Sequence, residues 1–168
     1  MRTAVVYYTL DGNCAIVAQE IKSKLDADLI RLHTKNEKRR GRIAKLFWGC
    51  GMVFSRKKPP LKPYTFDSAA YDLIIIGAPV WANSPAPPVQ TFISEAGITG
   101  KKIALFLCHA GGKGDAMEKL KAFLAGNDII AETDFKNPAN GNNEAVEQQI
   151  AGWVSDSLLP IDIAKDKQ

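Results

Sequence analysis

Residues 9–14, Thr9-Leu10-Asp11-Gly12-Asn13-Cys14, have the residue types of a turn that can bind a phosphate. A helix that begins here offers unpaired backbone N–H groups and a partial positive charge at its amino end. Gly12 lets the chain turn tightly enough for those N–H groups to converge on one anion. Thr9 adds a hydroxyl group and Asn13 an amide. The alternative interpretation is an ordinary capped turn between a strand and a helix.

Residues 77–88 place one tryptophan among four prolines. The candidate binding residues of this segment are Pro79, Val80, Trp81, Ala82 and Asn83. The planar indole of Trp81 suits stacking on a planar ring, from which it would exclude water. The alternative is a core tryptophan, but the end of a strand stiffened by prolines is a poor place to bury one.

Residues 108–115 form a third candidate segment, which is rich in glycine. Its candidate binding residues are His109, Ala110, Gly111, Gly112 and Lys113. Backbone N–H groups in such a loop can stabilise negative charge on a ligand, and Lys113 or His109 can add positive charge. We expect no catalytic Ser, His and carboxylate set, because none falls on the three segments together. Three cysteines without a CxxC pair and two histidines also predict neither a disulfide framework nor a metal site.

The elements that must position these segments follow from the hydrophobic pattern, because short β-branched runs alternate with stretches of helical period. The expected strands are residues 5–9, 28–33, 72–78, 102–108 and 129–135, and the expected helices are 13–25, 89–96, 115–124 and 144–158. Prolines 79, 85, 87 and 88 are expected to prevent regular structure before residue 89. Right-handed crossovers then favour an α/β fold with a doubly wound five-stranded parallel sheet of order 2-1-3-4-5 and helices on both faces. In that order the winding reverses between the first and third strands, which brings the three segments to one edge.

The composition predicts one globular domain over residues 1–160 with a flexible tail at 161–168. Hydrophobic residues make up 46% of the 168 residues and charged residues 24%, which is typical of globular proteins. No apolar run approaches the ~20 residues that a membrane span needs. The chain opens with a strand-like run rather than a secretory leader, so we expect a cytoplasmic protein.

The net charge of +4 comes from one segment, residues 34–62, which holds ten of the 22 basic residues and one of the 18 acidic ones. The rest of the chain is acidic, so the overall charge does not predict a nucleic-acid partner. Residues 39–58 interleave Arg and Lys with apolar residues, which predicts an amphipathic helix over the sheet. Its basic face is either a solvated surface or a docking site for an anionic surface, a nucleic acid or an acidic redox partner.

The run from Val5 to Ile21 resembles the flavodoxin signature, in which two apolar residues and an aromatic precede a Ser/Thr-x-x-Gly-Asn-Thr phosphate loop and a helix. Two positions depart from it: Cys14 replaces a hydroxyl residue, and Asp11 stands where a hydroxyl residue is common. We expect Asp11 to point to solvent and Cys14 to fill the turn, the alternative being a reactive thiol with a lowered pKa. The basic insertion before the third strand is similar to one found in a group of bacterial members of this family.

The resemblance implies a flavodoxin-like fold with FMN as the cofactor. It implies that the first segment holds the phosphate, that Trp81 stacks on the isoalloxazine ring, and that Ala82 and Asn83 lie near flavin N5. Residues 109–113 would cover the pyrimidine end, and no aromatic residue follows them to cover the other face of the ring. The favoured function is an electron carrier between redox partner proteins. An FMN-dependent NAD(P)H oxidoreductase acting on quinones and a binding module that has lost flavin stay open.

Overall fold

The computed structural model describes residues 1–35, 58–140 and 143–160, and its centre is a parallel sheet. The parallel strands are β1 (Thr3–Tyr8), β2 (Asp28–Leu32), β3 (Leu73–Trp81), β5 (Lys102–His109) and β6 (Asp128–Lys136). They lie in the order β2-β1-β3-β5-β6, which confirms the predicted order 2-1-3-4-5 of the five parallel strands. A sixth strand, β4 (Ser84–Pro85), pairs antiparallel with the end of β3 and was not predicted.

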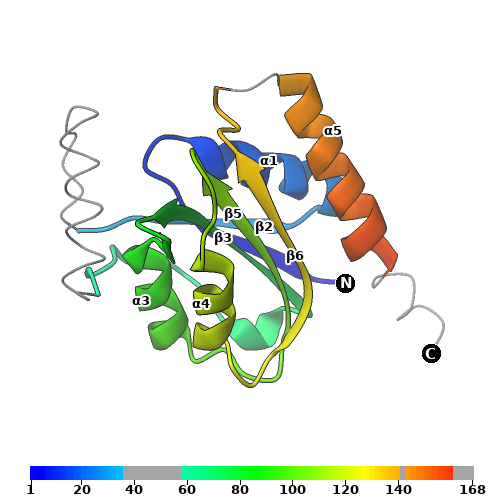
Figure 1. Ribbon diagram of the computed structural model, residues 1–168. Helices are drawn as coiled ribbons and strands as arrows, with labels where there is room; N and C mark the ends of the chain where they lie inside the picture. The colour runs from blue at the N-terminus through cyan, green and yellow to red at the C-terminus, as the bar shows by residue number, and fades with distance from the viewer. Residues whose placement is uncertain (36–57, 141–142, 161–168) are drawn as a thin grey trace.

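Helices cover both faces of the sheet, as Figure 1 shows. The helices are α1 (Asn13–Leu25), α3 (Pro87–Ala96), α4 (Ala116–Phe123) and α5 (Asn143–Trp153), with a 3-10 turn at Ser68–Ala70 and a π-helical turn at Val154–Leu158. Buried side chains of α1 and α5 share one hydrophobic cluster, and those of α3 and α4 share another. Alternate residues of β5 belong to the two clusters, as expected for a strand covered on both faces.

Regular structure does continue through the proline-rich segment, so the prediction of an irregular stretch up to residue 89 was wrong. Strand β3 runs through Pro79 to Trp81 before the hairpin to β4. The carbonyl of Pro79 accepts the N–H of Ala86 at 3.0 Å, so the side of Pro79 that lacks an N–H faces the hairpin and not β5. Pro87 and Pro88 lie in the first turn of α3, where their missing N–H groups have no helical partner to lose.

The basic insertion begins and ends at a short antiparallel contact just beyond β2. Thr34 pairs with Leu61, and the N–H of Lys35 donates to the carbonyl of Pro60 at 2.9 Å. Leu61 is buried in the cluster beneath α3 and α4, which fixes the returning chain. The expected amphipathic helix at 39–58 falls almost entirely outside the described residues, as do Cys50 and the tail at 161–168.

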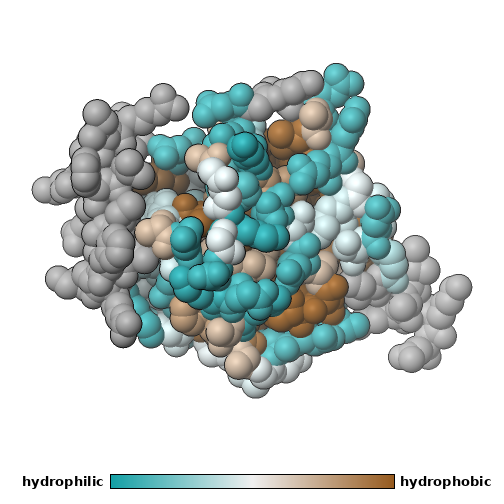
Figure 2. Space-filling view, in the orientation of Figure 1, coloured by the Kyte–Doolittle hydropathy of each residue, from teal (hydrophilic) through white to brown (hydrophobic). Residues whose placement is uncertain are grey.

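The surface seen in Figure 2 is largely hydrophilic, and its hydrophobic side chains occur in small separate areas. Among the described residues the exposed large hydrophobic side chains are Ile16, Phe123 and Leu159, on different parts of the chain. Within the same residues no helix is long and apolar enough to cross a membrane.

Candidate functional site

The three candidate segments lie side by side because β1, β3 and β5 are neighbours in the sheet and end at the same edge (Figure 1). Residues 9–14 follow β1, residues 79–85 form the end of β3 and its hairpin, and residues 109–115 follow β5. The predicted meeting of the three segments at the carboxyl edge is therefore confirmed. Parallel sheets of this kind bind ligands at that edge.

The first loop presents backbone N–H groups at the start of α1. Gly12 has φ +91°, a left-handed conformation, and its carbonyl accepts the N–H groups of Ala15 and Ile16 at 3.0 and 3.2 Å. The N–H of Gly12 donates to Thr9 Oγ1 at 3.0 Å, which closes the turn and leaves the Thr9 hydroxyl hydrogen to donate elsewhere. In the part of the chain that the structure describes, the N–H groups of Asn13 and Cys14 have no hydrogen-bond partner. Unpaired N–H groups at a helix start are suited to an anion.

The side chains of Asp11, Asn13 and Cys14 are exposed, paired or buried, so the backbone of this loop offers more hydrogen-bond donors to an anion than they do. Asp11 is exposed, as predicted. Asn13 accepts the N–H of Ala139 at 2.9 Å, so its side chain ties the loop to the connection after β6. Cys14 is completely buried; burial and then a hydrogen bond with Cys108 raise the pKa of its thiol well above the usual range. This confirms that Cys14 fills the turn and rejects the alternative of a reactive thiolate.

The hairpin after β3 turns through two residues with left-handed backbone, Ala82 (φ +45°) and Asn83 (φ +55°). Two consecutive positive φ angles are typical of the tight turns that join antiparallel strands. The turn leaves Trp81 at the tip of β3, partly buried, with its ring edge-on to the buried Tyr8 at 5.7 Å between centroids. Trp81 therefore packs against the edge of the core cluster with part of its ring exposed, and its stacking on a ligand stays a prediction.

The hairpin is held by two contacts that the sequence analysis missed. A Cβ atom built on Gly114, which has φ +47°, would stand 2.6 Å from Asn83 Oδ1, so the Asn83 side chain packs against the third loop. From α4, Lys119 Nζ donates to the Asn83 carbonyl at 2.8 Å and to Ser84 Oγ at 3.2 Å. No sequence signal identified Lys119, because its partners are 35 and 36 residues away.

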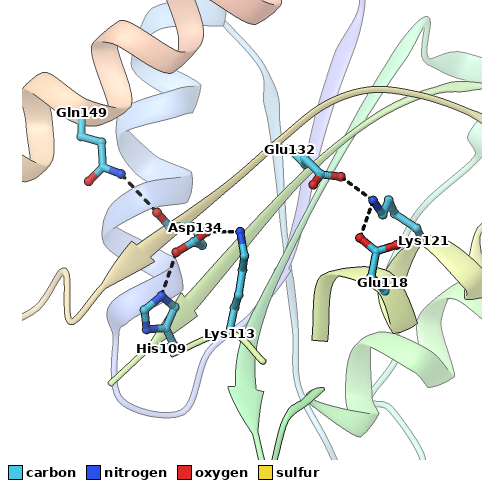
Figure 3. Close-up of polar contacts among 7 residues, drawn as sticks. All are labelled: His109, Lys113, Glu118, Lys121, Glu132, Asp134 and Gln149. Atoms are coloured by element: carbon cyan, nitrogen blue, oxygen red, sulfur yellow. Dashed lines mark hydrogen bonds and ion pairs between the residues drawn. The ribbon is translucent and has the colours of Figure 1, made fainter. Parts of the chain in front are cut away.

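Two residues of the third loop contact an acidic residue of β6 that the sequence analysis also missed (Figure 3). Asp134 of β6 contacts His109 Nε2 at 2.9 Å and Lys113 Nζ at 2.7 Å. The charge that Lys113 was expected to offer a ligand is therefore already paired. Ala110, Gly111 and Gly112 are exposed.

The connection after β6 also lies at the carboxyl edge of the sheet, where it contacts two of the three loops. Asn137, with φ +46°, donates its N–H to the carbonyl of His109 at 2.9 Å, and Ala139 donates to Asn13 as described above. This connection therefore links the first and third loops. Across residues 1–35, 58–140 and 143–160, no group of three or more His, Cys, Asp or Glu is placed to hold a metal ion. The arrangement can bind an anion through backbone N–H groups and offer one indole and one imidazole to a ring beside it.

No family model and no curated protein matches this chain. Solved structures do match it. A flavoprotein from Lactobacillus acidophilus NCFM, solved in complex with FMN, is 22% identical with a TM-score of 0.70, covering 83% of this chain and 96% of its own. A putative flavoprotein from Bacteroides eggerthii DSM 20697 is 18% identical with a TM-score of 0.73, covering 92% and 96%. Two-electron reduced Megasphaera elsdenii flavodoxin is 17% identical with a TM-score of 0.55, covering 86% and 93%. The chain therefore has the flavodoxin-like fold.

Proposed function

We propose that this chain binds FMN at the carboxyl edge of its sheet and carries electrons between redox partner proteins. One observation carries the proposal: the unpaired N–H groups at the start of α1 lie at the same edge as the half-buried indole of Trp81. The first feature suits a terminal phosphate and the second a planar ring. The Lactobacillus acidophilus flavoprotein, which shares the fold, was solved in complex with FMN.

The other residues of the edge fit this ligand. Thr9 has a hydroxyl hydrogen left to donate to the phosphate. Asp11 is exposed and not buried within the loop. Residues 79–83 would lie along the ring, and residues 109–113 would cover its pyrimidine end. Bound FMN supplies the reversible uptake of electrons, and the chain supplies its binding and shielding from water.

Titration of the apoprotein with FMN tests the proposal. We expect binding at micromolar concentration or tighter, seen as quenching of flavin fluorescence. Trp81→Leu should weaken binding by about tenfold, or about 1.4 kcal/mol, because an aromatic pair contributes that order of energy. Phe123→Leu is the matched control, since Phe123 is an exposed aromatic on α4 outside the site, and it should leave the affinity unchanged. A wild-type chain that does not bind FMN at tens of micromolar would contradict the proposal.

The electron-carrier role has its own test. Holoprotein mixed with NADPH alone should stay oxidised, and an added flavoprotein reductase should reduce it within seconds to minutes. Rapid bleaching by NADPH without a reductase would instead identify an FMN-dependent oxidoreductase.

A further inference from the structure

The turn between β3 and β4 has a backbone conformation that its own residues do not favour. Ala82 and Asn83 both have positive φ, +45° and +55°. Tight turns of this kind usually have Asn, Asp or Gly at the central positions, because a Cβ atom strains the left-handed conformation. Asn83 tolerates that conformation better than most residues, but Ala82 does not. The observed turn therefore requires support from residues outside it.

The support comes from the start of α4 and the loop before it. Lys119 Nζ donates to the carbonyl of Asn83 at 2.8 Å and to Ser84 Oγ at 3.2 Å. The carboxylate of Asp115 lies farther from the same nitrogen, at 4.0 Å, and is 79% exposed. Asn83 also packs against Gly114, two residues before α4 begins. The two short hydrogen bonds of Lys119 are therefore both made to the hairpin.

Helix α4 is a fixed support for this lysine. Ala116, Met117 and Leu120 are buried in the hydrophobic cluster beneath α3 and α4, and the helix packs against β4. Lys119 lies on the exposed side of the same helix. Its side chain therefore reaches the hairpin from a backbone position that the core holds in place.

The contact with Ser84 connects Lys119 to the position of Trp81. Ser84 is buried and is paired directly opposite Trp81 across the hairpin. Opposite residues of an antiparallel pair place their side chains on the same face of the sheet. A lysine that holds both Ser84 and the Asn83 carbonyl therefore restricts the backbone from which the indole of Trp81 projects.

We propose that Lys119 is a positioning residue, whose two hydrogen bonds hold the strained turn and thereby fix the indole of Trp81 for a planar ring. This inference rests on the proposed function, in which the ring is the isoalloxazine of FMN. Lys119 contributes to the affinity through Trp81 and not through a ligand contact of its own. An indole that is fixed before the ligand arrives loses less conformational freedom on binding, which strengthens the complex.

FMN titration of Lys119→Met tests the inference, because methionine keeps most of the side-chain length and removes the N–H donors. The affinity should fall by about fivefold, since the hydrogen bonds of an exposed lysine are weak and only part of their loss is transmitted to the indole. This loss is smaller than the one expected for Trp81→Leu. Lys119→Arg keeps both the charge and the donors, so it should restore the affinity to within about twofold of the wild type.

Lys121→Met is the matched control, because it removes the same charge from the same helix. Lys121 pairs with Glu118 and Glu132 at 2.7 and 3.0 Å, away from the hairpin (Figure 3). It should keep the wild-type affinity for FMN. Equal affinities of Lys119→Met and Lys121→Met would overturn the inference.

Combining Lys119→Met with Trp81→Leu distinguishes positioning from a direct effect of the lysine on the ligand. If Lys119 acts through the indole, the double variant should bind FMN as weakly as Trp81→Leu alone. Independent effects would instead multiply to a loss of about 50-fold, and that result would also overturn the inference.

The indole N–H signal of Trp81 in the ¹H–¹⁵N spectrum of the apoprotein is a readout that needs no FMN. Trp81→Leu assigns the signal by its loss. The signal should shift or broaden in Lys119→Met and stay as in the wild type in Lys119→Arg and Lys121→Met. An unchanged signal in Lys119→Met would overturn the inference even if its affinity for FMN fell.

Failure of the proposed function is recognised separately. In that case the wild type and all the variants fail to bind FMN at tens of micromolar. The indole signal of the apoprotein then still decides whether Lys119 positions Trp81.

Discussion

The first loop and the β3 hairpin lie next to each other at the same edge, but they are held in place in different ways. Residues 9–14 depend on local contacts: the left-handed Gly12, the Thr9 hydroxyl three residues before it, and the start of α1. The hairpin depends on distant residues, because Asn83 packs against Gly114 and its carbonyl accepts a hydrogen bond from Lys119. A single substitution should therefore disrupt a turn that depends on local contacts. In a turn held by several distant contacts, a single substitution should remove only one of them.

The largest effect is expected from Gly12→Ala. No atom lies within 4 Å of the added Cβ, so the cost is the strain of a left-handed backbone, about 1–2 kcal/mol in the free energy of unfolding. Relaxation of that strain would turn the N–H groups of Asn13 and Cys14 away from one another, so FMN affinity should fall by more than tenfold. Urea unfolding and FMN titration measure the two effects.

Gly100→Ala is the matched control for this prediction. Gly100 also has a positive φ, +67°, with no atom within 4 Å of the added Cβ, but it precedes β5 at the opposite edge of the sheet. It should lose similar stability and keep the wild-type FMN affinity. An equal loss of affinity in the two variants would mean that Gly12 acts through global stability alone.

Gly114→Ala should lower the free energy of unfolding by a similar amount to Gly12→Ala, but through the hairpin. The added Cβ displaces the Asn83 side chain, whose Cγ would be 2.8 Å away, and φ is +47°. We expect a loss of about 1–2 kcal/mol in the free energy of unfolding, of which only part comes from the displaced contact. Gly112→Ala is the control in the same loop, because it has no positive φ and no atom within 4 Å. Equal stabilities of the two variants would show that the contact between the hairpin and the third loop contributes nothing.

The same difference explains how much of the site the sequence predicted. The start of α1 at Asn13, the left-handed Gly12 and the buried Cys14 follow from signals within a few residues, and all three are observed. The parallel order of the strands was also predictable, because it follows from alternating patterns and crossover handedness.

Asp134 could not be placed from the sequence, because its position depends on one register shift between β5 and β6, where Ile103 pairs with Ile129 but Ala104 pairs with Ala131. A shift of a single residue exchanges the two faces of a strand, and nothing in the local pattern of β6 marked it. The hairpin was missed for a related reason. Pro79 and Pro85 indicated a break, and only the contact between Pro79 and Ala86 shows that the missing N–H faces away from β5.

The smallest effect is expected from Ala82→Gly, which removes strain where Gly12→Ala adds it. Ala82 has φ +45°, a conformation that costs a residue with a Cβ about 1–2 kcal/mol and glycine almost nothing. Glycine also makes the unfolded chain more flexible, which removes about 0.4–1 kcal/mol of that gain. The free energy of unfolding should therefore rise by up to about 1.6 kcal/mol. Ala125→Gly is the control, because Ala125 lies in an exposed turn without positive φ. It measures only the effect of a more flexible unfolded chain, so it should lower the free energy of unfolding. If both variants lose the same stability, Lys119 and Gly114 do not hold the turn in its left-handed form, and the hairpin is as locally determined as the first loop.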